Sequence, residues 1–417
     1  MALASPVQLE PSRLELPRRS SLPQRLMSLD ALRGFDMFWI IAAGSSIDGL
    51  NKATATGITS VLADQLDHVD WEGFHFYDLI FPLFVFIVGV SLVFSLTRTI
   101  EESGRGEALK RVFRRSALLF ILALIYSEGM NHRWPDIRLL GVLNRIALCY
   151  FFAGLIFCFV RVRGMIAICA SLLLGYWALM TFVPVRDIHL EKDHLRQLAA
   201  QTGVTNTMAL FTGTTKTVTG VFDKGMNLAN HLDYQYLPGR KYDVYWDPEG
   251  LLSTLPAIGT CLLGVFAGLL LRNRSIDDQR KVLWLLVGGA VSLAAGLLWG
   301  LQFPIVKKIW TSSFVLVAGG YSAILLGVFY QVVEVWNYRK WCQPFVWIGM
   351  NSITIYLASN IIGFRRLAER FVGGDVKYFL DAHVTRGFGD LLISLVGLGL
   401  ALSLVYYLYR KRIFLRL

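Results

Sequence analysis

Residues 75–97 read HFYDLIFPLFVFIVGVSLVFSLT, and this stretch decides the fold. It contains one carboxylate, Asp78, and no lysine or arginine. A helix needs roughly 20 apolar residues to cross the hydrocarbon core of a membrane, and this run is long enough. Lipid offers no hydrogen-bond partners to the backbone, so a spanning segment must satisfy its own polar groups. The stretch is therefore predicted to be a transmembrane helix.

The rest of the chain follows the same pattern. Of its 417 residues, 54% are hydrophobic and 17% are charged, and the mean hydropathy is +0.50. Soluble domains carry about 25% charged residues, so the composition excludes a soluble protein. We predict an all-α polytopic membrane protein with about ten transmembrane helices, which lie at residues 30–48, 75–97, 113–128, 139–160, 165–183, 251–271, 281–301, 311–336, 343–363 and 388–409.

The distribution of basic residues predicts the orientation of the chain. Short connections such as Arg161–Arg163, Arg272–Arg274 and Arg339–Lys340 are basic, and cytoplasmic connections carry an excess of Lys and Arg. Both termini are therefore predicted to be cytoplasmic, and the net charge of +11 indicates orientation, not nucleic-acid binding. The expected parts are a cytoplasmic tail at 1–29, a transmembrane domain at 30–409 with an extracytoplasmic cap at 184–250, and a basic cytoplasmic tail at 410–417.

Ionisable residues inside the spans mark candidate functional positions, because each costs several kcal/mol unless it is paired or hydrated. Arg33 and Asp36 begin the first span, where they form either a helix-start cap with an internal ion pair or part of a ligand site. Asp78 lies just before Pro82, which frees a backbone carbonyl. Asn144 and Arg145 lie in the fourth span. An arginine this deep predicts a nearby carboxylate or anionic ligand; the alternative is a structural pair with Asp78 or Glu249.

His68 stands out among the histidines because Asp67 and Asp70 flank it directly before a span. A histidine in this setting can take a proton from an attacking group or carry an acyl group as a nucleophile. The histidines show no HExxH spacing, and we expect no metal site. The chain also lacks the Walker A, GxGxxG and GxSxG motifs, which argues against an ATP-driven pump, a dinucleotide enzyme and a serine hydrolase.

Six segments resemble a known family in the same order along the chain. They are RLMSLDALRGFDMFW at 25–39, HVDWEG at 68–73, DLIFPLFVFIVG at 78–89, RLLGVLNRI at 138–146, WDPEGLL at 246–252 and MNSI at 350–353. This series resembles the heparan-α-glucosaminide N-acetyltransferase family and its NagX-like bacterial members. The similarity extends over nearly the whole chain.

The resemblance implies a membrane enzyme that transfers an acetyl group from cytoplasmic acetyl-CoA to an amino sugar on the other side. His68 is then the active histidine, and Asp78 joins it as a catalytic residue. The acceptor is expected at Trp71, Asn144, Arg145, Asp247 and Glu249. Coenzyme A is expected at Arg33, Asp36, Arg115, Asn351 and Ser352. Membrane lipid and a homodimer are the further implied partners, and the expected location is a bacterial inner membrane, because the extra N-terminal lumenal domain of the lysosomal members is absent.

Several alternatives stay open at the level of sequence. His68 acts either as a general base in a ternary complex or as an acetyl carrier in two steps. A sugar transporter suits ten spans with buried polar groups equally well, and a surface polysaccharide O-acetyltransferase differs only in its acceptor. One departure from the family concerns the end of the first span: lysosomal members have an asparagine there, and this chain has Gly44 or its neighbours.

Overall fold

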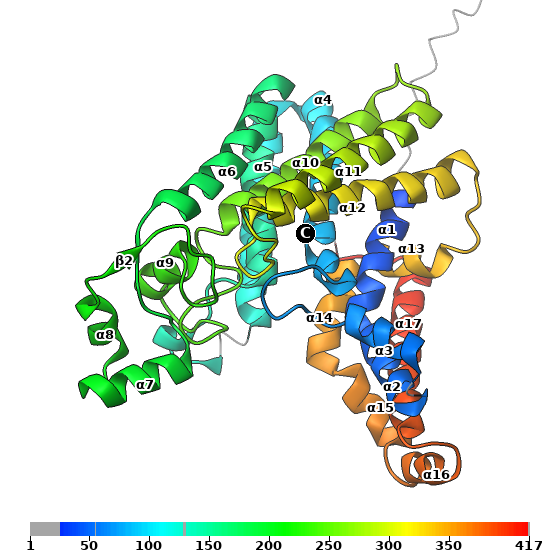
Figure 1. Cartoon of the computed structure of the whole chain (residues 1–417). Helices are drawn as coiled ribbons and strands as arrows, with labels where there is room; N and C mark the ends of the chain where they lie inside the picture. The colour runs from blue at the N-terminus through cyan, green and yellow to red at the C-terminus, as the bar shows by residue number, and fades with distance from the viewer. Residues whose placement is uncertain (1–25, 55, 128–130, 416–417) are drawn as a thin grey trace, which may run out of the picture.

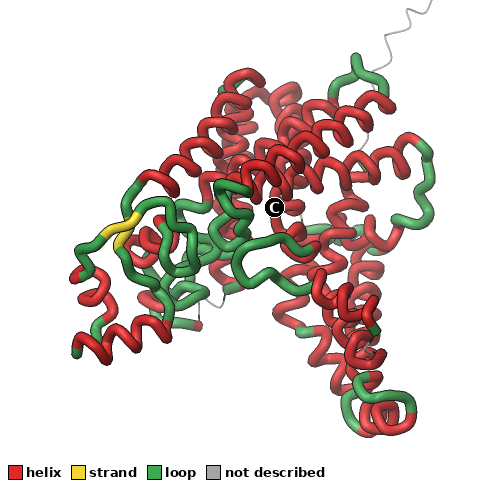
Figure 2. The backbone as a smooth tube through the Cα atoms, viewed as in Figure 1, coloured by secondary structure: helices red, strands yellow, loops and turns green. Residues whose placement is uncertain are grey.

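The structure is a computed structural model that describes residues 26–54, 56–127 and 131–415 (Figure 1). It confirms the all-α membrane fold, since most of the described chain is helical and the two strands in it have two residues each (Figure 2). Within these residues, seven helices are long and apolar enough to cross a membrane, or eight if one bent pair is counted as a span. Most of the tail expected at 1–29 lies outside the described residues. Near Gly44 the backbone is described but the side chains are not.

The spanning helices fall where hydropathy predicts them. The seven are α4 (Phe76–Tyr126), α5 (Val142–Phe159), α6 (Val162–Phe182), α10 (Thr254–Arg272), α11 (Asp278–Gly300), α12 with its π-helical end η4 (Ser312–Tyr330 and Gln331–Val335), and α17 (Phe388–Arg410). The bent pair consists of α13 (Gln343–Met350) and α14 (Ser352–Ile362), which meet at an angle of 79°. The chain is thus an integral membrane protein.

Helix α4 contains two of the predicted spans. Gly104 interrupts it with non-helical angles, φ 83° and ψ 172°, and glycine adopts a positive φ without steric cost. Arg111 donates a hydrogen bond of 3.0 Å to the Thr99 hydroxyl, although a straight helix would separate these residues by about 18 Å along its axis. The chain therefore reverses at Gly104, and the segments 75–97 and 113–128 are separate arms of a hairpin.

The first predicted span is built from three consecutive pieces. They are α1 (Met27–Phe38), the π-helical segment η1 (Trp39–Ala43) and α2 (Gly44–Thr54). Short π-helical segments inside helices are frequent at functional sites. Each predicted span therefore overlaps a single helix, one arm of α4, the bent pair of α13 and α14, or this run of three pieces.

The region 184–250 folds as a small unit, here called the cap, at the lower left of Figure 1. It contains α7 (Lys192–Thr202), α8 (Thr207–Gly213), α9 (Leu228–Tyr236) and an antiparallel pair of strands, β1 (Val185–Arg186) and β2 (Thr217–Val218). Its own hydrophobic cluster includes Phe211 and Trp246. The remaining short helices are α3 (Gly57–Gln65), η3 (Trp134–Asp136), α15 (Phe364–Val372) and α16 (Asp375–His383).

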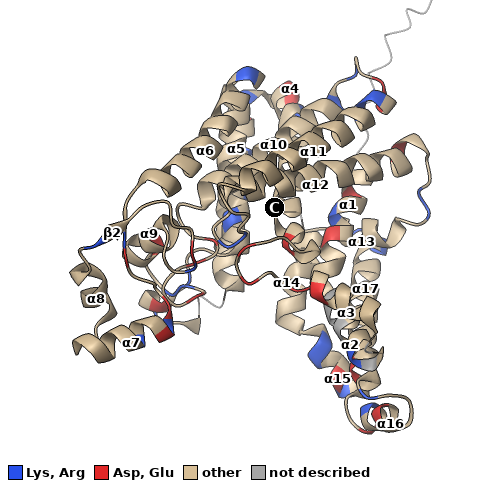
Figure 3. Ribbon diagram, viewed as in Figure 1, with Lys and Arg blue, Asp and Glu red and all other residues tan. Residues whose placement is uncertain are grey.

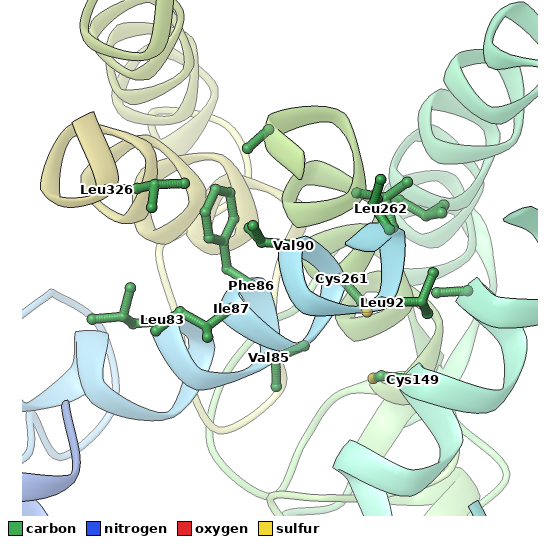
Figure 4. Packing of buried hydrophobic residues seen from close by; sticks show 14 of the residues in the cluster. Leu83, Val85, Phe86, Ile87, Val90, Leu92, Cys149, Cys261, Leu262 and Leu326 are labelled. Carbon is green, nitrogen blue, oxygen red and sulfur yellow. The ribbon is translucent and has the colours of Figure 1, made fainter. Parts of the chain in front are cut away.

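The core of the bundle is the crossing of α4 and α10. Phe86 and Val90 of α4 are buried there, and they lie near Leu262 of α10 (Figure 4). Gly89 and Gly264 let the two backbones approach closely, as small residues do between membrane helices. Charged residues gather mainly near helix ends and in connections, and the middles of α6, α10, α11 and α12 carry none (Figure 3).

Gly264→Ala is expected to destabilise the bundle, because the added Cβ would collide with the backbone carbonyl oxygen of Phe86. Overpacking of this kind typically costs about 1–3 kcal/mol. The measurement is the midpoint of thermal unfolding in detergent. Gly288→Ala on α11 is the matched control, since no atom lies within 4 Å of a Cβ added there. Equal midpoints for the two variants would contradict the prediction.

Candidate functional site

A cavity of about 610 Å³ lies where α4, α5 and α14 approach the connections outside the spans. Its apolar wall comes from spanning segments and its charged wall comes largely from the connections. The apolar side chains include Met37, Ile40, Ile80, Phe81, Phe84, Val142, Leu143, Ile146 and Ile353. The polar and aromatic ones are His68, Asp70, Tyr77, Asp78, Arg138, Tyr242, Glu249, Lys307, Lys308, Ser352 and Tyr356.

His68 and Asp78 form a hydrogen-bonded pair in this cavity. The Nδ1 atom of His68 lies 2.8 Å from Oδ1 of Asp78. The Asp78 side chain is 1% exposed and that of His68 is 48% exposed. Because a carboxylate only accepts, Nδ1 is the protonated nitrogen, and Nε2 keeps its lone pair. A carboxylate that holds a histidine in this tautomer prepares the second nitrogen to accept a proton.

Local sequence explains why Asp78 points at His68. Asp78 lies in the first turn of α4, where the partial positive charge of the helix N-terminus favours a carboxylate. Its Oδ2 atom accepts hydrogen bonds from the backbone N–H of His75 at 3.1 Å and of Val69 at 3.4 Å. The carboxylate therefore ties the loop that carries His68 to the start of the helix.

Lys307 completes this cluster, and the sequence pattern did not single it out. Its Nζ atom lies 3.0 Å from Nδ1 and 3.3 Å from Nε2 of His68. The same atom lies 3.2 Å from Oδ1 of Asp78. Burial lowers the pKa of Lys307, although Asp78 acts in the opposite direction. Lys307 lies in the short connection between α11 and α12, and from the sequence alone it is one of several basic residues outside the spans.

A second charged cluster lines another part of the cavity. Arg138 donates two hydrogen bonds of 2.8 Å to the carboxylate of Asp247 and one of 2.8 Å to Glu249. Burial acts to lower the pKa of Arg138, but the two carboxylates outweigh it and raise the pKa. Asp247 lies behind the cavity wall, whereas Arg138 and Glu249 face the cavity. The sequence placed Arg138 in a family segment but not among the site residues.

The other residues predicted for the acceptor lie outside the cavity lining. Trp71 donates a hydrogen bond of 2.9 Å from its indole to the carbonyl of Phe222 and packs edge-on against Trp246. It thereby joins the His68 loop to the cap. Asn144 is buried and donates to the carbonyl of Phe120 at 3.4 Å.

Arg145 has carboxylates near it, as the sequence suggests, but no direct ion pair with them among the described residues. In the described part of the chain it forms no ion pair with Asp78 or Glu249. Its guanidinium lies 4.9 Å from the centre of the Trp310 ring and donates to the Ser253 hydroxyl and to the carbonyl of Gly250. The ring face adds a cation–π contact to the electrostatic attraction that Glu249, Asp247 and Asp233 exert on the guanidinium.

The residues predicted for coenzyme A lie mostly away from His68. Ser352 lines the cavity, and Asn351 is buried beside it at the break between α13 and α14. Arg33 pairs with Asp30 at 3.4 Å and donates to the Ser91 hydroxyl at 2.6 Å, as the helix-start interpretation expects. Asp36 is buried, and neither of its carboxylate oxygens has a hydrogen bond from a residue that the structure describes. Arg115 lies over the Tyr150 ring at 4.9 Å. Arg33, Asp36 and Arg115 do not line the cavity.

Comparison with known proteins supports the family resemblance. Residues 25–190 match the family described as heparan-alpha-glucosaminide N-acetyltransferase, catalytic. The human heparan-alpha-glucosaminide N-acetyltransferase is 26% identical over 439 residues, which cover 95% of this chain and 60% of the relative. The mouse protein of the same name is 26% identical over 379 residues, which cover 83% of this chain and 56% of the relative. The chain thus spans about three fifths of the length of these curated relatives, and the resemblance seen in its motifs is confirmed.

Proposed function

We propose that this chain, as a relative of the heparan-α-glucosaminide N-acetyltransferases, is a membrane N-acetyltransferase that moves an acetyl group from acetyl-CoA to an amino sugar of the glucosamine type. The observation that carries the proposal is the His68–Asp78 pair, which faces a cavity of about 610 Å³. The histidine can act as a base, and the apolar side chains of the spanning helices that line the cavity can contact the long chain of the thioester.

The reaction that suits this geometry is a direct acyl transfer. The neutral amine of the sugar attacks the carbonyl carbon of the thioester, and the carbon–sulfur bond breaks as the amide bond forms. Nε2 of His68 takes one proton from the attacking nitrogen and returns it to the departing thiolate, so that the products are the N-acetyl sugar and the free thiol. Asp78 holds the imidazole in the required tautomer and stabilises its charged form.

The acceptor half of the site is assigned to the second charged cluster. Glu249 faces the cavity and offers a carboxylate to the ammonium form of the amino sugar. Asp247 holds Arg138 beside it, and Trp71 fixes the His68 loop to the cap. Asn144 and Arg145 lie behind this wall and support it.

The donor half is assigned to the opposite end of the bundle. Arg33 donates a hydrogen bond to Ser91 of α4. At a rise of about 1.5 Å per residue, Ser91 lies about 20 Å along the helix from Asp78. Arg33 and Arg115 are proposed to attract the phosphates of coenzyme A there, with Asp36 in the same region, while Asn351 and Ser352 contact the arm that reaches into the cavity. Both termini are proposed to be cytoplasmic in a bacterial inner membrane, with the cap on the outer side.

Purified protein in liposomes tests this function directly. Labelled acetyl-CoA is supplied on one side of the membrane and glucosamine on the other, and labelled N-acetylglucosamine is measured together with the position of coenzyme A. We expect acetylated sugar to form while coenzyme A stays on its own side. Sugar flux that is independent of acetyl-CoA would instead indicate a transporter. Labelling of an acceptor that has hydroxyls but no amine would indicate an O-acetyltransferase.

A further inference from the structure

The connection between α11 and α12 holds Lys307 in a tight turn. The backbone N–H of Trp310 donates to the carbonyl of Lys307 at 2.9 Å, and that of Thr311 donates to Val306 at 3.2 Å. Trp310 closes the turn with φ +52°. This left-handed conformation is unfavourable for a bulky residue, and such conformations persist only where the surroundings hold them.

Buried contacts hold Trp310 in this conformation. Its indole N–H donates to the Thr260 hydroxyl at 3.1 Å. Its ring packs edge-on against Phe81 at 5.0 Å and Phe314 at 5.3 Å, and Arg145 covers one face. The side chain is 1% exposed. The turn that presents Lys307 is therefore anchored in the core, which is how a reacting group is kept in one position.

The same turn is joined to the loop that carries His68. The backbone N–H of Gly73 donates to the carbonyl of Ile305 at 2.9 Å, and Glu72 and Val306 form an antiparallel bridge. Backbone hydrogen bonds thus connect two segments that are far apart in the sequence. His68 and Lys307 consequently belong to one rigid unit at the edge of the cavity.

The charges around Lys307 leave its ammonium facing the cavity. Asp78 and His68 touch it, Glu249 acts on it from across the cavity, and Lys308 is its neighbour in the chain. Lys308 lines the same cavity but is paired separately: its Nζ atom lies 3.9 Å from Asp70 and 5.9 Å from the centre of the Trp246 ring. Burial lowers the pKa of Lys307, and the adjacent Asp78 carboxylate opposes that effect by favouring the ammonium form.

We propose that Lys307 stabilises the negative charge that develops on the thioester carbonyl oxygen during acetyl transfer. This inference rests on the proposed function. As the amine attacks, the carbonyl π electrons move to the oxygen. The ammonium of Lys307 lies beside His68, which takes the proton from the attacking nitrogen. When the tetrahedral intermediate collapses, the carbonyl re-forms and the thiolate leaves. Lys307 keeps its proton throughout, and a fixed cation in a site shielded from water is an effective stabiliser of such charge.

Lys307→Met and Lys307→Arg, with Lys192→Met as the control, separate this role from a structural one. We expect K307M to lower kcat by about 100-fold, as the loss of one oxyanion partner does, with little change in KM for the sugar. K307R keeps the charge and should recover a large part of kcat. Loss of a cation beside His68 favours the imidazolium, so the acidic limb of the pH–rate profile of K307M should move to higher pH. K192M should leave kcat and the profile unchanged, because Lys192 is an exposed residue of the cap helix α7 that does not line the cavity.

Two outcomes overturn the proposal in distinguishable ways. A wild-type protein that transfers no acetyl group from acetyl-CoA overturns the proposed function and this inference together. An active wild type with a K307M variant that matches it in kcat and pH profile overturns the role of Lys307 alone. Thermal unfolding in detergent establishes that each variant is folded, and K307Q, measured in the same assays, takes the place of K307M if that variant does not fold.

Discussion

His68→Ala is expected to lower kcat for acetyl transfer by about 10³-fold, within the range in which general acid–base catalysis contributes. The imidazole is the one group in the cavity with a carboxylate on one nitrogen and a lone pair on the other, among the residues that the structure describes. Without it, the cavity loses the group that is proposed to move the proton from amine to thiolate. The measurement is the rate of N-acetylglucosamine formation at saturating acetyl-CoA.

Two further variants make this result specific. Asp78→Asn should also lower kcat strongly, because an amide can force the imidazole into the wrong tautomer. His383→Ala is the matched control, since His383 lies on α16 and contacts only the carbonyl and ring of Phe379 among the described residues. Activity of His68→Ala close to that of His383→Ala would contradict the assignment.

Wild type and His68→Ala together distinguish the two possible roles of His68. An acetyl carrier forms a covalent acetyl-enzyme when acetyl-CoA is present without acceptor, and hydroxylamine releases the group as acetyl hydroxamate. A general base in a ternary complex forms no such species. Single-turnover trapping with wild type and His68→Ala therefore decides between them.

The spans could be predicted from sequence because lipid imposes a strong and local requirement. Every spanning segment must be apolar for about 20 residues, whatever its neighbours are. The hairpin of α4 was predicted as two spans for the same reason, since a charged stretch separates its arms. The π-helical segment at Trp39–Ala43 was not predicted, because it changes the backbone hydrogen bonding without changing the apolar character of the sequence.

The site was predicted only where its partners are close in sequence. His68 and Asp78 lie on either side of one helix start, and both could be named as candidates from a short segment, although their hydrogen bond was not predicted. Lys307 and His68 are 239 residues apart in the sequence. Arg138 and Asp247 are 109 residues apart, with α5, α6 and most of the cap between them. No local pattern encodes such contacts. Carboxylates lie near Arg145 as the sequence suggests, but its contact with the Trp310 ring, 165 positions away, was not predicted.

Arg138→Met is expected to destabilise the protein by about 3–5 kcal/mol, the cost of removing one partner from a buried ion pair. The variant leaves the carboxylates of Asp247 and Glu249 side by side without their shared cation. The Asp247 side chain is 0% exposed, so water cannot replace the lost hydrogen bonds. A lower midpoint of thermal unfolding and a loss of transferase activity should appear together, because Glu249 lines the cavity.

Arg240→Met is the matched control, because Arg240 is an exposed arginine in the connection that carries Asp247 and Glu249 and has no ion pair among the described residues. It should unfold like the wild type. Arg138→Lys should lie between the two, since a lysine keeps the charge but cannot donate the paired hydrogen bonds of a guanidinium. Asp247→Asn in the Arg138→Met background removes one unpaired charge and should recover part of the stability. If Arg138→Met and Arg240→Met unfold at the same temperature, the cluster does not hold the cap against the bundle, and the acceptor wall must be stabilised by the apolar contacts of Trp71 and Trp246 instead.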